Sequence, residues 1–164
     1  MKINWDAFDL QLILDGKPID LKKKYQEDIK ISKETIDDNL MKQASLYAFY
    51  AVMAELAEEA YEDAKLELEL LEATTDEHYR AEFIKTGQKV TEKKMEKMVA
   101  LNKSRIESAK KVIQARKNRG ILKALTRAFE QRNLDVIALG HICRQERDVD
   151  IFIKKEEYKK KYEK

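Results

Sequence analysis

Apolar residues recur at three- and four-residue steps through the first half of the chain. In the first long run they are Leu46, Phe49, Tyr50, Met53, Ala57, Ala60, Ala64, Leu68 and Leu71. Acidic residues occupy seven of the remaining positions, and neither glycine nor proline interrupts the run before Gly87. Because this spacing gathers apolar side chains on one face of an α-helix, we predict a long amphipathic helix over residues 46–71. The helix either breaks at residues 74–76 or is capped there and continues.

A second run with the same spacing follows Gly87, where we expect a turn. Thr91 followed by Glu92 is typical of a helix start. The apolar positions are Met95, Met98, Val99, Leu101, Ile106, Ala109, Val112, Ile113, Ile121, Leu122, Leu125, Ala128 and Phe129, and the pattern resumes at Leu134. Asn102 either caps a second segment or faces solvent within one helix. The apolar stripe lapses over residues 116–120, where we expect no side chain to face the core.

The first 19 residues follow a different pattern. Apolar residues roughly alternate with polar ones, which favours an extended strand. Asp15 and Gly16 indicate a turn, and Pro18 prevents a helix from running through. We expect an arm that packs on the helical body or crosses to a neighbouring subunit. Asp20 is a plausible cap for a short helix within residues 20–31.

The composition supports an all-α fold. The 164 residues include only four glycines and one proline, and 39% of them are charged. Few helix breakers in a charged and apolar chain indicate long helices. We predict two long amphipathic helices in a hairpin, with short flanking helices and an extended N-terminal arm. The expected organisation is an arm at 1–19, a helical domain at 20–150, and a charged, frayed tail at 151–164.

The single cysteine, Cys143, rules out an intrachain disulfide, as is usual in a reducing compartment. No apolar run approaches the roughly 18 residues that span a membrane, and no signal-peptide pattern follows Met1. We therefore expect a soluble, intracellular protein without a membrane partner.

Catalytic and metal-binding motifs are missing from the sequence. His78 and His141 lie far apart, and no HExxH, CxxC or phosphate-binding glycine motif occurs. Acidic residues that share helix faces, such as Glu55, Glu58 and Glu62, could hold a divalent ion but are equally typical of a solvated face. We expect no enzyme activity, no cofactor and no metal site.

Charge is distributed very unevenly along the chain. Residues 85–132 contain fifteen bases and four acids, a net charge of +11, whereas residues 50–82 have a net charge of −9. Within the basic stretch, helical spacing forms one row from Lys89, Lys93 and Lys97. A second row, with Lys117 beside it, consists of Arg116, Arg119, Lys123 and Arg127. Rows of this kind can follow a phosphate backbone, so these eight residues are the predicted nucleic-acid contacts.

Two observations bear on this prediction. Phe129 is the only aromatic residue between 85 and 132, so we expect little base stacking and little sequence preference. The acidic and basic helices could also pair with each other through ion pairs. In that case the chain would be a non-catalytic scaffolding protein whose helices assemble through complementary charge.

Short motifs in a characteristic order resemble the recombination mediators of T-even-type phages, the UvsY-like family. Leu46-Tyr47 opens the first long helix, and Lys89-x-Thr91-Glu92 opens the second. The basic helix with Leu122 and Leu125 follows. The remaining matches are Arg132-x-Leu134, Leu139-Gly140 and Arg144-Gln145-Glu146. The resemblance covers residues 20–148; the apolar arm, the lysine-rich tail and the acidic stretch 66–76 depart from it.

The resemblance implies a small helical protein that forms a ring of several subunits. Such proteins bind single-stranded DNA without sequence preference. They help to load a RecA-like recombinase onto strand covered by a single-strand-binding protein, and they have no catalytic activity. It also implies a location in the cytoplasm of an infected host cell. Since residues 66–76 are acidic here, we assign the DNA role only to the region from Lys89 to Arg127.

Overall fold

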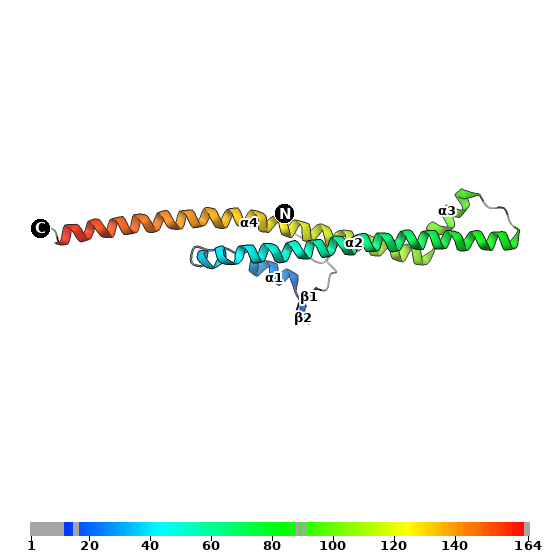
Figure 1. Ribbon diagram of the computed structural model, residues 1–164, viewed down its shortest axis with the longest axis horizontal. Helices are drawn as coiled ribbons and strands as arrows, with labels where there is room; N and C mark the ends of the chain where they lie inside the picture. The colour runs from blue at the N-terminus through cyan, green and yellow to red at the C-terminus, as the bar shows by residue number, and fades with distance from the viewer. Residues whose placement is uncertain (1–11, 15–16, 88, 90, 163–164) are drawn as a thin grey trace. The chain divides into compact units, whose positions relative to one another are not determined.

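The structure is a computed structural model that describes residues 12–14, 17–87, 89 and 91–162. Two short strands, β1 (Leu12–Leu14) and β2 (Lys17–Ile19), precede the helix α1 (Leu21–Asp28). The long helix α2 (Ile36–Thr86), the short helix α3 (Glu92–Leu101) and the long helix α4 (Lys103–Tyr162) follow (Figure 1). The predicted all-α fold with two long helices and short flanking elements is confirmed.

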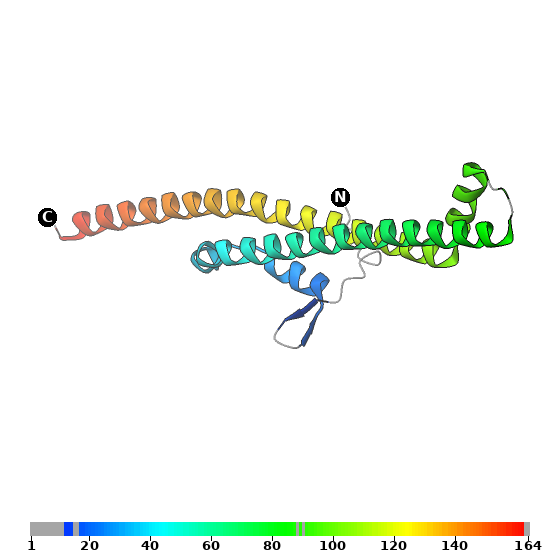
Figure 2. The same cartoon turned by 45° about the vertical axis from the view of Figure 1, so that its right-hand side comes forward.

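The two strands form a small antiparallel hairpin in which Leu12 lies opposite Ile19 and Leu14 opposite Lys17 (Figure 2). This agrees with the extended arm predicted for the end of residues 1–19. Residues 1–11 and the turn predicted at Asp15 and Gly16 lie outside the described residues. After the hairpin, the Asp20 carboxylate accepts a hydrogen bond from the Lys23 N–H at 3.0 Å and so caps α1, as predicted.

Local hydrogen bonds explain where the helices start and stop. The Thr74 hydroxyl donates to the Leu70 carbonyl at 2.9 Å, so this residue sits inside α2 and does not break it. Helix α2 ends at Thr86, and Gly87 has a φ of 66°, a conformation that favours glycine. Thr91 caps α3 as predicted, and Asn102 ends α3 while its side chain accepts from the Arg105 N–H of α4.

Helices α2 and α4 contribute to two compact units. Unit 1 contains residues 51–124, and unit 2 contains residues 12–50 and 125–162. In unit 2 the core is aromatic: the rings of Tyr50 and Phe129 stack with centroids 4.2 Å apart, and Tyr25 of α1 meets both edge-on. Tyr50, Phe129, Leu125 and Val136 are fully buried. Unit 2 is therefore held together mainly by burial of large apolar side chains.

A buried arginine also belongs to the core of unit 2. Arg132 is only 3% exposed, and its guanidinium donates to the side chains of Gln43 and Asn39 and to the Lys30 carbonyl at 3.2 Å. Gln43 in turn donates to the Phe129 carbonyl at 2.8 Å. Burial lowers the pKa of Arg132. Arg132 therefore acts as a packing residue, although it contributes to the charge counted in the basic stretch.

Unit 1 has a thinner core than unit 2. Its buried residues from α2 are mostly small, Ala54, Ala57 and Thr75, together with Tyr61. The other buried residues of unit 1 are Ser108, Asn118 and Leu122 of α4, and Met95 of α3. In Figures 1 and 2 the green end of α2 lies alongside the first, yellow-green part of α4. Small residues bring two helices close together but bury little apolar surface.

Three expectations about α4 are wrong. Residues 154–162 are helical, whereas we expected a frayed tail, because α4 continues to Tyr162. One residue of 116–120 does face the core, since Asn118 is only 6% exposed and closes the gap in the apolar stripe. Ile113, expected in the core, is 55% exposed. Ile113 is one of six residues whose apolar faces we expected to hold the hairpin; of the other five, Leu125 and Phe129 are buried, and Leu46, Phe49 and Met53 are partly buried.

Candidate nucleic-acid interface

The first basic row lies at α3 in unit 1. Lys89 precedes the helix, and Lys93 and Lys97 lie one and two turns further on, all three exposed. Met95, between the last two, is buried and sets the inward face of α3. None of the described residues forms an ion pair with these three lysines. The row therefore presents three free ammonium groups to solvent.

Contacts at both ends hold α3 against α2. At its start, Arg80 donates to both carboxylate oxygens of Glu92, at 2.9 and 2.7 Å. At its end, the Asn102 side chain donates to the Tyr79 hydroxyl at 3.1 Å. The Arg80 guanidinium lowers the pKa of Glu92, so this pair stays charged at neutral pH. The lysine row is thus carried by a helix with a defined position within unit 1.

The second predicted row divides into two kinds of residue. Arg116 and Lys117 are exposed, and no described residue pairs with them. Arg119 and Lys123 instead converge on one carboxylate of α2: both lie within ion-pair distance of Glu58 Oε2, at 2.7 and 2.5 Å. The Arg119 guanidinium also lies 4.7 Å from the centre of the Tyr61 ring. Half of this row is therefore engaged inside unit 1.

The two bases change the pKa of Glu58. Lys123, with Arg119, lowers the pKa of its carboxyl group, which stays ionised throughout the neutral range. This cross-helix contact is the internal charge pairing that the sequence left open, and Arg105 of α4 forms a second one with Glu72 at 2.8 Å. The acidic helix neutralises part of the basic one, while Lys89, Lys93, Lys97, Arg116 and Lys117 stay unpaired among the described residues.

Arg127, the last predicted contact, is exposed but belongs to unit 2. The other seven predicted contacts lie in unit 1. Phe129, the only aromatic residue in the basic stretch, is fully buried and so cannot stack on a base. The exposed cations therefore offer phosphate binding without aromatic base recognition.

A further basic row was not singled out from the sequence. Lys103, Lys110 and Lys117 are exposed and recur every seven residues, which places them along one face of α4. The seven-residue spacing is visible in the sequence. Isoleucines lie between these lysines. The face therefore has neither the continuous apolar pattern of a core stripe nor the continuous charge of a basic row, which are the two patterns that periodicity identifies.

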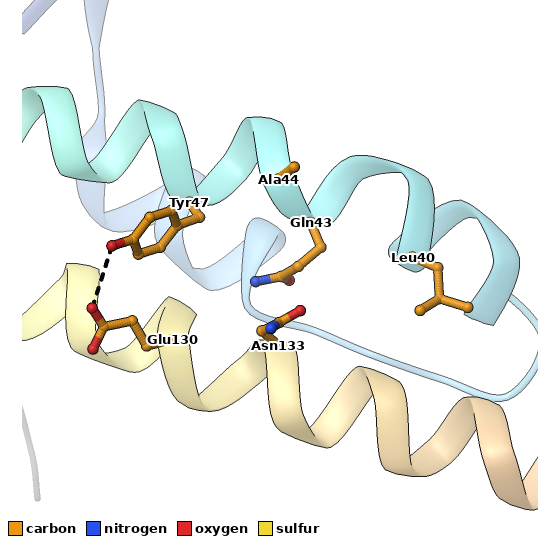
Figure 3. Close-up of a pocket in the computed structure, with 6 residues that line it drawn as sticks. All are labelled: Leu40, Gln43, Ala44, Tyr47, Glu130 and Asn133. Carbon is orange, nitrogen blue, oxygen red and sulfur yellow. Dashed lines mark hydrogen bonds between the residues drawn. The ribbon is translucent and has the colours of Figure 1, made fainter.

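A groove in unit 2 has different chemistry. Leu40, Gln43, Ala44, Tyr47, Glu130 and Asn133 line it, and its volume is about 390 Å³ (Figure 3). The Tyr47 hydroxyl donates to Glu130 at 3.3 Å across the groove. Because its one charged group is a carboxylate, the groove does not suit a phosphate.

The acidic residues considered as ligands for a divalent ion are used differently. Glu58 is engaged by Arg119 and Lys123, and Glu62 pairs with Lys65 at 2.9 Å. Of the three carboxylates Glu55, Glu58 and Glu62, two thus form ion pairs with basic side chains. Their arrangement favours charge pairing over metal coordination.

No family model matches the chain, and no match was found among the curated proteins or the solved structures. Within the described ranges, none of the helices combines the length and the apolar character needed to cross a lipid bilayer.

Proposed function

We propose that this chain is a non-catalytic recombination mediator of phage type, similar to the UvsY-like family, that binds single-stranded DNA without sequence preference. One observation carries the proposal. Five of the seven predicted contacts in unit 1 are exposed and have no ion-pair partner among the described residues, although an acidic helix packs beside them: Lys89, Lys93, Lys97, Arg116 and Lys117. Charge that the protein has not neutralised internally is available to a polyanion.

The binding mode follows from the side chains. Each lysine or arginine that contacts a phosphate releases a counterion, so the affinity depends steeply on salt and hardly on base sequence. Flexible, exposed side chains suit a single strand, whose phosphates take no fixed geometry. Arg119 and Lys123 can reach a phosphate only by breaking their ion pairs with Glu58. They therefore contribute less to the affinity for a single strand than their charge suggests.

The proposed role has further partners. Several subunits form a ring that organises the strand on its basic surface. The ring loosens the hold of a single-strand-binding protein and presents the strand to a RecA-like recombinase, in the cytoplasm of an infected host cell. In this mechanism the protein acts through binding alone.

The test uses two exposed neighbouring bases. The double variant Arg116→Glu with Lys117→Glu should weaken binding to labelled oligo-dT by about tenfold or more, because it replaces two phosphate contacts by repulsion. The matched control is Lys154→Glu with Lys155→Glu, which changes the same charge on an exposed part of α4 in unit 2. Equal affinities for both double variants would contradict the site.

A second candidate function is supported by the cross-helix ion pairs of Glu58 and Glu72. They favour a scaffolding protein whose helices assemble through complementary charge and need no nucleic acid. The two functions differ when the protein is purified at low salt. A mediator should carry nucleic acid with it, seen as a raised ratio of absorbance at about 260 nm to that at about 280 nm, whereas a scaffold should not.

A further inference from the structure

Helix α2 exposes an apolar stripe on the side of unit 1 that faces away from its core. Residues two positions apart point in roughly opposite directions on a helix, so Val52 and Leu56 point away from the buried Ala54. Leu66 and Leu70 lie further along the same line, and the exposed Glu59 and Asp63 lie between the two apolar pairs. All four apolar side chains are between 50% and 58% exposed. An outward stripe of this length is unusual for a helix that already has its partner on the other face.

Helix α4 carries a corresponding stripe on its own outer side. Ile106 and Ile113 lie seven residues apart and are 38% and 55% exposed. The buried Ser108 is two residues from Ile106 and so points the opposite way, towards α2. This explains why Ile113 is outside the core: it belongs to a second apolar phase of the helix. Unit 1 therefore has one apolar stripe on each outer face.

The two stripes are bordered by opposite charges. Within and around the α2 stripe the exposed charged residues are Glu55, Glu59, Glu62, Asp63 and Glu67. A shallow groove, lined by Ala51, Val52, Glu55, Leu56, Glu58 and Glu59, opens on this face with a volume of about 470 Å³. The α4 stripe alternates with Lys103, Lys110 and Lys117. Each face thus combines apolar contacts with charges that would repel its own kind and attract the other.

We propose that a second copy of this chain docks its α4 stripe, Ile106 and Ile113, onto the α2 stripe of its neighbour. A second copy is the occupant because the complement to each face is present on the same chain, with matching helical geometry and opposite charge. The contact is head-to-tail, since it joins two different faces, and repetition of it generates a ring or a filament. The inference rests on the homo-oligomer part of the proposed function and shares only Lys117 with its DNA-binding part.

This assembly has a consequence for the basic surface. Lys117 lies within the α4 stripe and is covered when a neighbour docks. Lys89, Lys93 and Lys97 lie at α3, outside both stripes, and stay available to a strand. Assembly should weaken as salt increases, because the charges that border the stripes are exposed and therefore screened.

The test exploits the two different faces. Leu66→Lys places a base on the acidic face, and Ile113→Glu places an acid on the basic face. Both sites are exposed, so the helices should form normally, which circular dichroism checks. The control is Leu101→Glu, on α3 outside both stripes, where the side chain is 77% exposed. Sedimentation velocity measures the size of each protein, and oligo-dT anisotropy follows strand binding separately.

We expect the wild type and the Leu101→Glu control to form species larger than a dimer at low salt. Each stripe variant alone should be monomeric. An equimolar mixture of the two stripe variants should form dimers at least, because the intact α4 face of one variant meets the intact α2 face of the other. A monomeric wild type, stripe variants that assemble normally, or a mixture that stays monomeric would each overturn the proposal. A wild-type protein that assembles normally but does not bind oligo-dT would instead contradict the DNA role alone.

Discussion

Helices α2 and α4 are packed differently in the two units. In unit 2 they bury a stack of Tyr50 and Phe129, with Leu125 and Val136 fully enclosed. In unit 1 they bury Ala54, Ala57, Leu122 and polar residues, and they are joined by ion pairs that are partly open to water. Partly exposed ion pairs contribute little to stability, whereas each large buried side chain contributes about 1.5–3 kcal/mol. The stability of the hairpin should therefore reside mainly in unit 2.

The comparison also shows where function can lie. A core of large side chains fixes the positions of nearby residues, even a charged one such as Arg132. In unit 1 fewer side chains are committed to packing, and its helices present free lysines and apolar stripes to their surroundings. The unit with the weaker core thus carries the surfaces that we assign to DNA and to a second copy.

The largest effect is expected from opening the core of unit 2. Phe129→Ala should lower the free energy of unfolding by about 3–5 kcal/mol, because it removes a fully buried ring that stacks on Tyr50. Ile113→Ala, at an exposed apolar site of unit 1, should change it by less than about 0.5 kcal/mol. Urea unfolding followed by circular dichroism measures both. Similar losses of unfolding free energy for the two variants would show that unit 2 does not hold most of the stability.

A smaller effect is expected from releasing the bases held in unit 1. Glu58→Gln removes the carboxylate that engages Arg119 and Lys123, and frees both for phosphate contacts. The slope of log affinity for oligo-dT against log salt should become steeper by about 1.4, since each additional phosphate contact with a single strand adds about 0.7.

Glu59→Gln is the matched control for this change. It removes the same charge from the next position of α2, where no described residue forms an ion pair with Glu59. It should tighten binding slightly through the overall field and leave the salt slope unchanged. Equal slopes for the two variants would mean that Glu58 does not withhold the two bases.

The smallest effect concerns acid pH. The pKa of Glu58 is lower in the folded protein than its ordinary value of about 4.3, with Lys123 as the main cause. A lowered folded pKa adds stability above the ordinary value, and this stability is lost as the pH falls through the folded pKa. Wild type should be more stable than Glu58→Gln at pH 7, and the difference should shrink as the pH falls below about 4.3 and through the folded pKa. A difference that persists unchanged at pH 3 would contradict the ion pairs as its source.

The sequence predicted the elements of the fold better than the fate of single side chains. The caps at Asp20 and Thr91 and the turn at Gly87 depend on neighbouring residues only, so local chemistry identifies them. Ile113 was misplaced because α4 has apolar residues in two phases, and periodicity alone does not tell which phase meets α2. Only the packing of the two helices decides it.

The charged residues illustrate a second limit of prediction from the sequence. Arg119, Lys123 and Arg132 look alike in the sequence of a basic helix. In the structure the first two are held by Glu58 and the third is buried beside Gln43. These fates depend on which residue of α2, some 60 to 90 positions away, lies opposite each base. The basic stretch was thus predictable as a whole, whereas the subset free to bind DNA was not.

The most direct measurement is the affinity of the wild-type protein for labelled oligo-dT across a salt series, followed by fluorescence anisotropy. If the five unpaired cations among the predicted contacts of unit 1 each contact a phosphate, log affinity should fall linearly with log salt with a slope of about −3.5, or about −2.8 where a docked neighbour covers Lys117. Binding should be micromolar or tighter at low salt. An absence of binding at low salt would show that the acidic helix already satisfies the basic one, and would favour assembly through complementary helices as the role of this chain.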